Sequence, residues 1–151
     1  QGGNNNAYCQ DNALSWFDWD LAARNADFLE FTRKALAAAR RFPVLQRRRF
    51  GTGAHDMRWF AADGGAPDWD DPEGRGLAWL LDGQLFLVAN ADHRLRAQAL
   101  PDPGAGRRWR RLGDTSLQAG DDFAEAGREV PVDPPGPYLV NGRSVVVLVA
   151  S

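Results

Sequence analysis

Hydrophobic residues follow two different spacings along this 151-residue chain, and the spacing changes near Phe50. Between Asn25 and Phe42 an apolar residue recurs at every third or fourth position, which predicts one long amphipathic helix that Pro43 ends. The apolar stripe consists of Phe28, Phe31, Ala35, Ala38 and Phe42, widened by Leu29 and Leu36.

The ends of this predicted helix have their own signals. Asn25 or Asp27 can cap the first turn, and Asp27 with Glu30 has the spacing of a capping box. Arg40 and Arg41 place positive charge near the C-terminus, where it suits the helix dipole. A stripe this wide needs an apolar partner, so we expect the helix to dock on the β domain or to mediate self-association.

From Phe50 onward apolar residues alternate with polar ones, as in β-strands. Leu77 to Leu81 and Leu85 to Asn90 flank Asp82-Gly83, a favoured hairpin turn. Further strands are predicted at 95–99, 109–112, 130–132, 138–140 and 143–149, and the last is the most apolar and should be central. In 94–99 the residues Arg94, Arg96 and Gln98 alternate with apolar ones, as on a half-exposed strand. Several antiparallel strands with Pro- and Gly-rich loops predict a small β-sandwich.

Composition is ordinary for a globular protein and excludes several classes. The formal net charge of -2 argues against nucleic-acid binding. Cys9 is the single cysteine, so no internal disulfide is possible and a cytoplasmic location is expected. We predict no membrane span, because no apolar run reaches about 18 residues, and no signal peptide. No motif indicates a cofactor or a metal. The start at Gln1 is typical of a shortened chain.

The opening stretch, QGGNNNAYCQDNALSWFDWDL, is the one segment that packing alone does not explain. Its Gly and Asn residues favour a shaped loop over a helix or a strand. Aromatic rings that can stack on sugar faces follow, interleaved with amide and carboxylate groups that can bind hydroxyls. The alternative is a loop whose Asn side chains bond its own backbone while its rings fill a hydrophobic gap.

Short motifs in a fixed order resemble the C-terminal part of bacterial glycogen debranching enzymes, the isoamylase-like branch of the α-amylase superfamily. The first is GGNNNAYCQDN followed by SWFDWDL, which resembles the region after the last barrel strand. The others are HDMRWF, PDWDDP, LFLVANA, WRRLGDT and YLVNGRSVVVL, which resemble the C-terminal domain of that family. The resemblance spans almost the whole chain.

The resemblance implies a fold and a domain division. Residues 1–50 would be the end of a (β/α)8 catalytic barrel, with a loop and the last helix, and residues 51–151 would be an antiparallel β-sandwich. The fold class is therefore mainly β. The parent enzyme would hydrolyse α-1,6-glucosidic branch linkages of α-glucans such as glycogen or limit dextrin.

The resemblance also implies that the Asp nucleophile, the Glu general acid and a further Asp lie outside this chain, which would then be structural and inactive. Retaining hydrolysis needs two carboxyl groups about 5 Å apart on a rigid scaffold. We predict no catalytic residue here. The residues implied to line the substrate are Asn4, Asn5, Asn6, Tyr8, Trp16 and Trp19. A non-catalytic carbohydrate-binding module is the alternative function, and a pure scaffold is a third.

Three further groups have a chemical and a structural interpretation. Asp68, Asp70, Asp71 and Glu73 could bind a cation, but a solvated acidic turn is favoured because the loop lacks the glycine and distant Glu of an EF-hand. His55-Asp56 resembles half a catalytic triad without a serine. Trp59, Trp69 and Trp79 could form a sugar-stacking platform, but a sandwich core or a domain seam is favoured.

Overall fold

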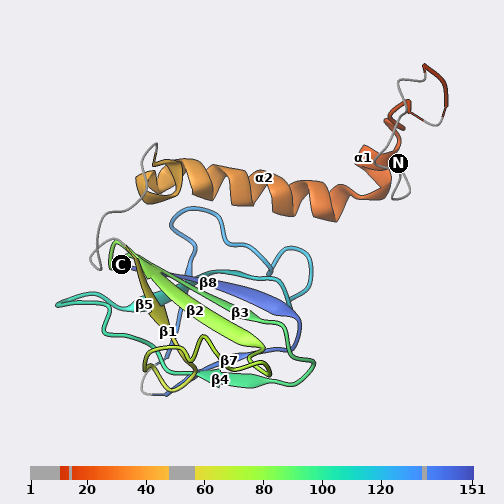
Figure 1. Cartoon of the computed structure of the whole chain (residues 1–151). Helices are drawn as coiled ribbons and strands as arrows, with labels where there is room; N and C mark the ends of the chain where they lie inside the picture. The colour runs from red at the N-terminus through yellow and green to blue at the C-terminus, as the bar shows by residue number, and fades with distance from the viewer. Residues whose placement is uncertain (1–10, 14, 48–56, 134–135) are drawn as a thin grey trace.

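A computed structural model describes residues 11–47 and 57–151 apart from 14, 134 and 135, and it shows a β-sandwich with a long helix against one sheet (Figure 1). The helical part comprises α1 (Leu21–Arg24), α2 (Ala26–Arg41) and the 3-10 turn η1 (Pro43–Gln46). The strands are β1 (Met57–Phe60), β2 (Gly76–Leu81), β3 (Leu85–Asn90), β4 (Arg96–Gln98), β5 (Trp109–Asp114), β6 (Val130–Pro131), β7 (Tyr138–Val140) and β8 (Ser144–Ala150).

Two antiparallel sheets form the sandwich, which confirms the predicted fold class. The large sheet has six strands in the order β1-β2-β3-β8-β5-β6, and the small sheet pairs β4 with β7. The predicted hairpin joins β2 to β3, and Asp82 and Gly83 both have the positive φ that its turn requires. The most apolar strand, β8, lies between β3 and β5 as predicted. Whether residues 1–50 belong to a barrel stays a prediction.

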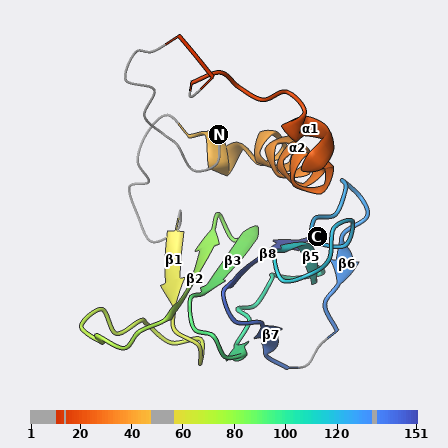
Figure 2. The same cartoon turned by 90° about the vertical axis from the view of Figure 1, so that its right-hand side faces the viewer.

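The large sheet buries side chains on both of its faces, because successive residues of a strand point to opposite sides. One face packs on the small sheet around Phe60, Leu80, Phe86 and Leu148. The other face packs under α2 around Leu85, Leu112, Phe123 and Val149. Figure 2 shows the resulting three layers, with α2 above the large sheet and β7 below it.

The helix α2 docks on the sandwich through the inner part of its apolar stripe. Phe31, Ala35 and Ala38 pack against the second core cluster, and Phe42 just after the helix is buried in it. The ring of Phe31 meets the ring of Phe123 edge to face, with centroids 5.6 Å apart. Of the two expected outcomes, docking on the β domain is therefore observed. The outer residues Phe28, Leu29 and Leu36 remain exposed.

The loop between β5 and β6 supplies the surface that α2 contacts. It folds back on β5, where the amide of Asp114 donates to the carbonyl of Asp122 over 2.8 Å and Phe123 pairs with Gly113. A side chain at Gly113 would place its Cβ 2.8 Å from the ring of Phe123, so only glycine fits this close approach. The same loop ends at Glu129, whose carboxylate pairs with Arg41 of α2 at 2.6 Å.

Two local predictions are wrong. The N-cap of α2 is Asn25, and its side chain makes no capping bond. The capping box of Asp27 and Glu30 does not form, because the helix begins at Ala26 and Asp27 already lies inside its first turn. The second concerns β4, where the polar residue is inside: Gln98 is fully buried while Ala97 and Leu95 are exposed.

The reason for this reversal is a pair of hydrogen bonds. The side-chain amide of Gln98 donates to the carbonyl of Ala61 over 2.8 Å and to that of Ala99 over 3.1 Å. The bond to Ala61 fastens the loop after β1 to the small sheet, and both bonds give the buried amide of Gln98 partners. In the described part of the chain, no helix combines the length and the apolar character needed to cross a bilayer.

Candidate functional site

The segment 11–20, here called the aromatic arm, extends beyond the N-terminal end of α2, away from the sheets (Figure 1). Its aromatic residues face solvent: Trp16 is 62% exposed and Trp19 is 80% exposed. The rings of Phe17 and Trp19 meet edge to face with centroids 5.0 Å apart. The indole N–H of Trp16 donates to the carboxylate of Asp11 over 2.6 Å, so this ring is oriented by the arm itself.

The carboxylates of the arm hold its backbone in place. Asp18 accepts a hydrogen bond from the amide of Asp20 over 3.0 Å and forms an ion pair with Arg24 of α1. The carbonyl of Asn12 accepts from the amides of Ser15 and Trp16, at 2.9 and 3.0 Å. These contacts form a local turn and lead the chain into α1. Asp18 is therefore engaged in structure, and both it and Asp20 lie open to solvent.

The predicted substrate-lining residues divide into two sets. Trp16 and Trp19 are described, and both present their rings outward on the arm. Asn4, Asn5, Asn6 and Tyr8 lie outside the described residues, as do Cys9 and the His55-Asp56 pair. The described arm thus offers exposed rings beside carboxylates, the combination that stacks on sugars and bonds their hydroxyls.

The acidic loop between β1 and β2 uses its carboxylates on its own backbone. Asp68 accepts from the amide of Asp70 over 3.0 Å, and Asp71 accepts from the amide of Glu73 over 2.9 Å. Glu73 also pairs with Arg75 at 3.2 Å. This is the geometry of an acidic turn in solvent. Among the residues that the structure describes, no three His, Cys, Asp or Glu side chains gather as a metal site requires.

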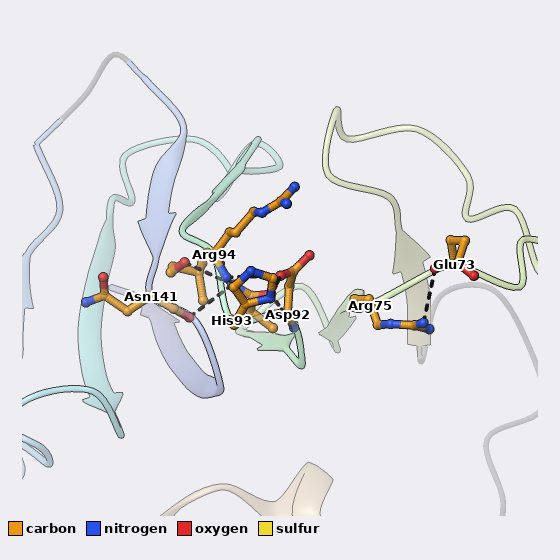
Figure 3. Close-up of polar contacts among 8 residues, drawn as sticks. Glu73, Arg75, Asp92, His93, Arg94 and Asn141 are labelled. Atoms are coloured by element: carbon orange, nitrogen blue, oxygen red, sulfur yellow. Dashed lines mark hydrogen bonds and ion pairs between the residues drawn. The ribbon is translucent and has the colours of Figure 1, made fainter.

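A second polar cluster lies where the turn after β3 meets the turn between β7 and β8 (Figure 3). Asp92 accepts from the amide of Arg94 over 3.0 Å, and this bond, with the nearby His93 and Arg94, holds the pKa of Asp92 below its usual value. His93 contacts the same carboxylate at 2.9 Å. The side chain of Asn90 donates to the carbonyls of Arg94 and Asn141. The cluster ties two turns together.

A buried carboxylate was missed by sequence reasoning. Asp114 at the end of β5 is almost fully buried and accepts from the hydroxyl of Ser116 over 2.6 Å and from that of Tyr138 over 3.2 Å. Burial, together with the negative charge of Asp114, raises the pKa of Tyr138. The hydroxyl of Ser116 also accepts from the amide of Asn141 over 3.0 Å. These partners satisfy the carboxylate and join β5 to β7.

A cavity of about 790 Å³ lies between one end of the large sheet and the small sheet. Its walls are mainly apolar, and the indole N–H of Trp109 is bonded to the carbonyl of Pro101 at 2.7 Å. The cavity touches none of the predicted site residues.

The three tryptophans Trp59, Trp69 and Trp79 form a cluster that belongs to neither buried core. Of the two structural interpretations, the sandwich core is therefore wrong for this cluster, because Trp59 and Trp79 point to the face of the large sheet that also carries Leu87 and Val147, the α2 side. A seam between domains and a sugar-stacking platform both stay open at this point.

Comparison with known proteins gives a family. Residues 56–149 match the family model described as Isoamylase, C-terminal. A glycogen operon protein GlgX homolog of Mycobacterium tuberculosis is 31% identical over 98% of this chain and 23% of its own length. An isoamylase of Flavobacterium sp is 28% identical over 99% of this chain and 22% of its own. A glycogen debranching enzyme of Dickeya chrysanthemi is 37% identical over 68% of this chain and 16% of its own length. The chain spans less than a quarter of the length of these relatives.

Proposed function

This chain belongs to the isoamylase C-terminal domain family, and from that premise we propose that it is the C-terminal part of an enzyme that hydrolyses α-1,6 branch linkages of glycogen. The observation that supports the proposal most is the alignment of relatives named as isoamylase and GlgX homolog along almost the whole chain. On this proposal the catalytic carboxylates lie outside the chain, and the chain alone is inactive. Its α-glucan substrate and the single Cys9 suit the cytoplasm.

We propose that residues 1–50 complete the catalytic barrel of the parent and that residues 51–151 form an accessory β-sandwich. The exposed face of α2 supports this division. Its inner stripe packs on the sandwich, while Phe28, Leu29 and Leu36 on the outside have large exposed apolar surface. A helix with two apolar faces is expected where it lies between two packed layers. The outer residues would then contact the barrel.

The aromatic arm is proposed to line the substrate site of the parent. Active sites of (β/α)8 barrels lie on loops at the C-terminal ends of the strands, and the arm directly precedes the helices α1 and α2. The exposed rings of Trp16 and Trp19 would stack on glucose units, and Asn4, Asn5, Asn6 and Tyr8 would bond or pack on neighbouring sugars. The arm therefore supplies substrate contacts but no catalytic group.

Alanine variants of the arm in the full-length parent test this role. We expect Trp16→Ala and Asn5→Ala to lower kcat/KM on limit dextrin about tenfold or more, since each removes a contact worth roughly 1–2 kcal/mol in the transition state. Leu139→Ala, an exposed apolar residue on the small sheet, is the matched control and should leave kcat/KM unchanged. Wild-type kcat/KM in both arm variants would remove the arm from the substrate site.

A further inference from the structure

The tryptophan cluster, defined as Trp59, Trp69 and Trp79, is an exposed aromatic feature of the sandwich itself. Trp59 on β1 lies directly opposite Trp79 on β2, with ring centroids 5.8 Å apart. Trp69, from the loop between these strands, contacts Trp59 at 5.7 Å. Trp59 is 39% exposed and Trp69 is 66% exposed. Three indoles thus meet at the β1 edge of the large sheet and leave ring surface in water.

The loop that presents Trp69 is shaped by its own hydrogen bonds. Asp68 and Asp71 each accept a hydrogen bond from the amide two residues ahead, so Trp69 is the central residue of one side-chain turn and a second turn follows it. At the start of the loop, the amide of Ala61 donates to the carbonyl of Gly65 over 2.8 Å and closes a turn of residues 61–65. These bonds fix where the indole of Trp69 stands. Its exposure is therefore a property of an ordered loop, and the ring is available to a ligand without a conformational change.

The angles between the rings indicate the shape of that ligand. The plane of Trp59 is tilted by 83° from that of Trp69 and by 44° from that of Trp79. A flat β-1,4-linked glucan needs rings in one plane, whereas the faces of successive glucose units in an α-1,4-linked glucan turn along a curve. Carboxylates of Asp68 and Asp70 flank Trp69 and can accept hydrogen bonds from sugar hydroxyls.

We propose that the tryptophan cluster binds a short α-1,4-linked glucan segment, as a surface site separate from the aromatic arm. The choice of an α-glucan rests on the proposed function, and the choice of a surface site rests on the exposed, angled rings. In the parent, such a site would hold an outer branch of glycogen and raise the local concentration of branch points near the barrel.

The charge around the cluster disfavours a second copy of this chain as the occupant. Glu73 has an ion-pair partner in Arg75, but within the described residues Asp68, Asp70 and Asp71 have none. Two copies joined through their clusters would bring these acidic loops together, at a cost in like-charge repulsion. A neutral sugar with many hydroxyl donors meets the same acidic rim without that cost.

Isothermal titration of the 151-residue chain with maltoheptaose tests the site. We expect binding by the wild type, at least about tenfold weaker binding by Trp69→Ala, and partial recovery in Trp69→Phe, because a smaller ring still stacks. Phe28→Ala removes an exposed ring from α2 and is the matched control that should bind as the wild type does. Cellohexaose, the flat β-linked analogue, should bind no variant. Far-UV circular dichroism of each variant shows whether it is folded.

Several outcomes would overturn the proposal. The site is refuted if the wild type does not bind maltoheptaose, if a folded Trp69→Ala binds it with unchanged affinity, or if cellohexaose binds equally well. It is also refuted if Trp16→Ala loses binding while Trp69→Ala keeps it, because the sugar then binds the aromatic arm. A dimer in solution that Trp69→Ala dissociates would show that a second copy of the chain occupies the cluster. The proposed function fails separately: a parent that debranches glycogen while this chain binds no sugar refutes the surface site alone. A parent inactive on branched glucan beside a chain that binds maltoheptaose refutes the function alone.

Discussion

At the scale of single residues, the buried carboxylate of Asp114 is the polar centre of the sandwich. Its two oxygens accept from Ser116 and Tyr138, which belong to the loop after β5 and to the small sheet. A buried carboxylate is costly unless its lone pairs are satisfied, so these partners are needed for the fold. The arrangement also makes the stability of the protein depend on the protonation of Tyr138.

The Tyr138 hydroxyl predicts a loss of stability at alkaline pH. Its pKa in the folded chain is raised above 10.0, so the unfolded chain releases this proton first as the pH increases. The stabilisation is therefore complete below pH 10 and falls as the pH rises toward the folded pKa. We expect Tyr138→Phe to be less stable at pH 7, by about 0.5–1.5 kcal/mol, and to lose less stability between pH 9 and 11 than the wild type.

Urea unfolding at each pH measures this difference, with the free energy of unfolding compared between the two proteins. Parallel pH profiles for the wild type and Tyr138→Phe would show that the hydroxyl does not titrate as the structure implies. A steeper loss in the variant would contradict the sign of the shift.

Single-residue roles were the least predictable from sequence. Gln98 sits in an alternating pattern that favours the apolar residues as the buried ones, yet it is inside, where its amide donates to the carbonyls of Ala61 and Ala99. The local sequence around Asp114 did not indicate that its carboxylate would be buried, since its partner Tyr138 is 24 residues away along the chain. Polar burial depends on which distant groups become neighbours, and local patterns do not contain that information.

At the scale of elements, the docking of α2 decides how the first part of the chain relates to the sandwich. Its contacts are the Phe31–Phe123 ring pair, the buried Phe42 and the Arg41–Glu129 ion pair. Burial raises the pKa of Glu129, but hydrogen bonds from backbone amides and from Arg41 outweigh that effect and lower it overall. Glu129 therefore stabilises the docked helix when the pH is above the pKa that this carboxyl has in the unfolded chain. The stabilisation is lost as the pH falls through the lower pKa of the folded chain.

Replacement of Phe31 tests the docked helix. Phe31→Ala should destabilise the chain by about 1–2 kcal/mol, because it removes half-buried ring surface and the edge-to-face contact with Phe123. Leu36→Ala, on the exposed side of the same helix, should change the free energy of unfolding by less than about 0.5 kcal/mol. The measurement is urea unfolding followed by circular dichroism. Equal midpoints for the two variants would mean that α2 does not pack as described.

Elements were the most predictable scale. The hairpin of β2 and β3 and the central position of β8 followed from the turn signal and from apolar content, and the structure confirms both. The helix spans nearly the predicted residues, since its period and Pro43 mark it clearly. Which side of the stripe would be buried was not predictable, because Phe28 and Phe31 are equally apolar and only Phe31 meets Phe123.

At the scale of the whole molecule, the chain is a sandwich whose large sheet is covered on both faces, with an aromatic arm outside it. The resemblance of its motifs predicted the family, and the match over residues 56–149 confirms that prediction. The substrate role of the arm stays a proposal, because substrate contacts depend on strands that the resemblance assigns to the parent. Self-association through Phe28, Leu29 and Leu36 likewise stays a prediction.

The central claim is that this chain is the non-catalytic C-terminal part of a debranching enzyme, and one assay tests it directly. Equal molar amounts of the full-length parent and of the 151-residue chain are incubated with glycogen limit dextrin, and the release of reducing ends is followed. We predict release by the parent and none by the chain, because the family resemblance assigns the catalytic Asp and Glu residues to the part of the parent outside this chain. Hydrolysis by the chain alone, or a parent that leaves branch linkages intact, would contradict it.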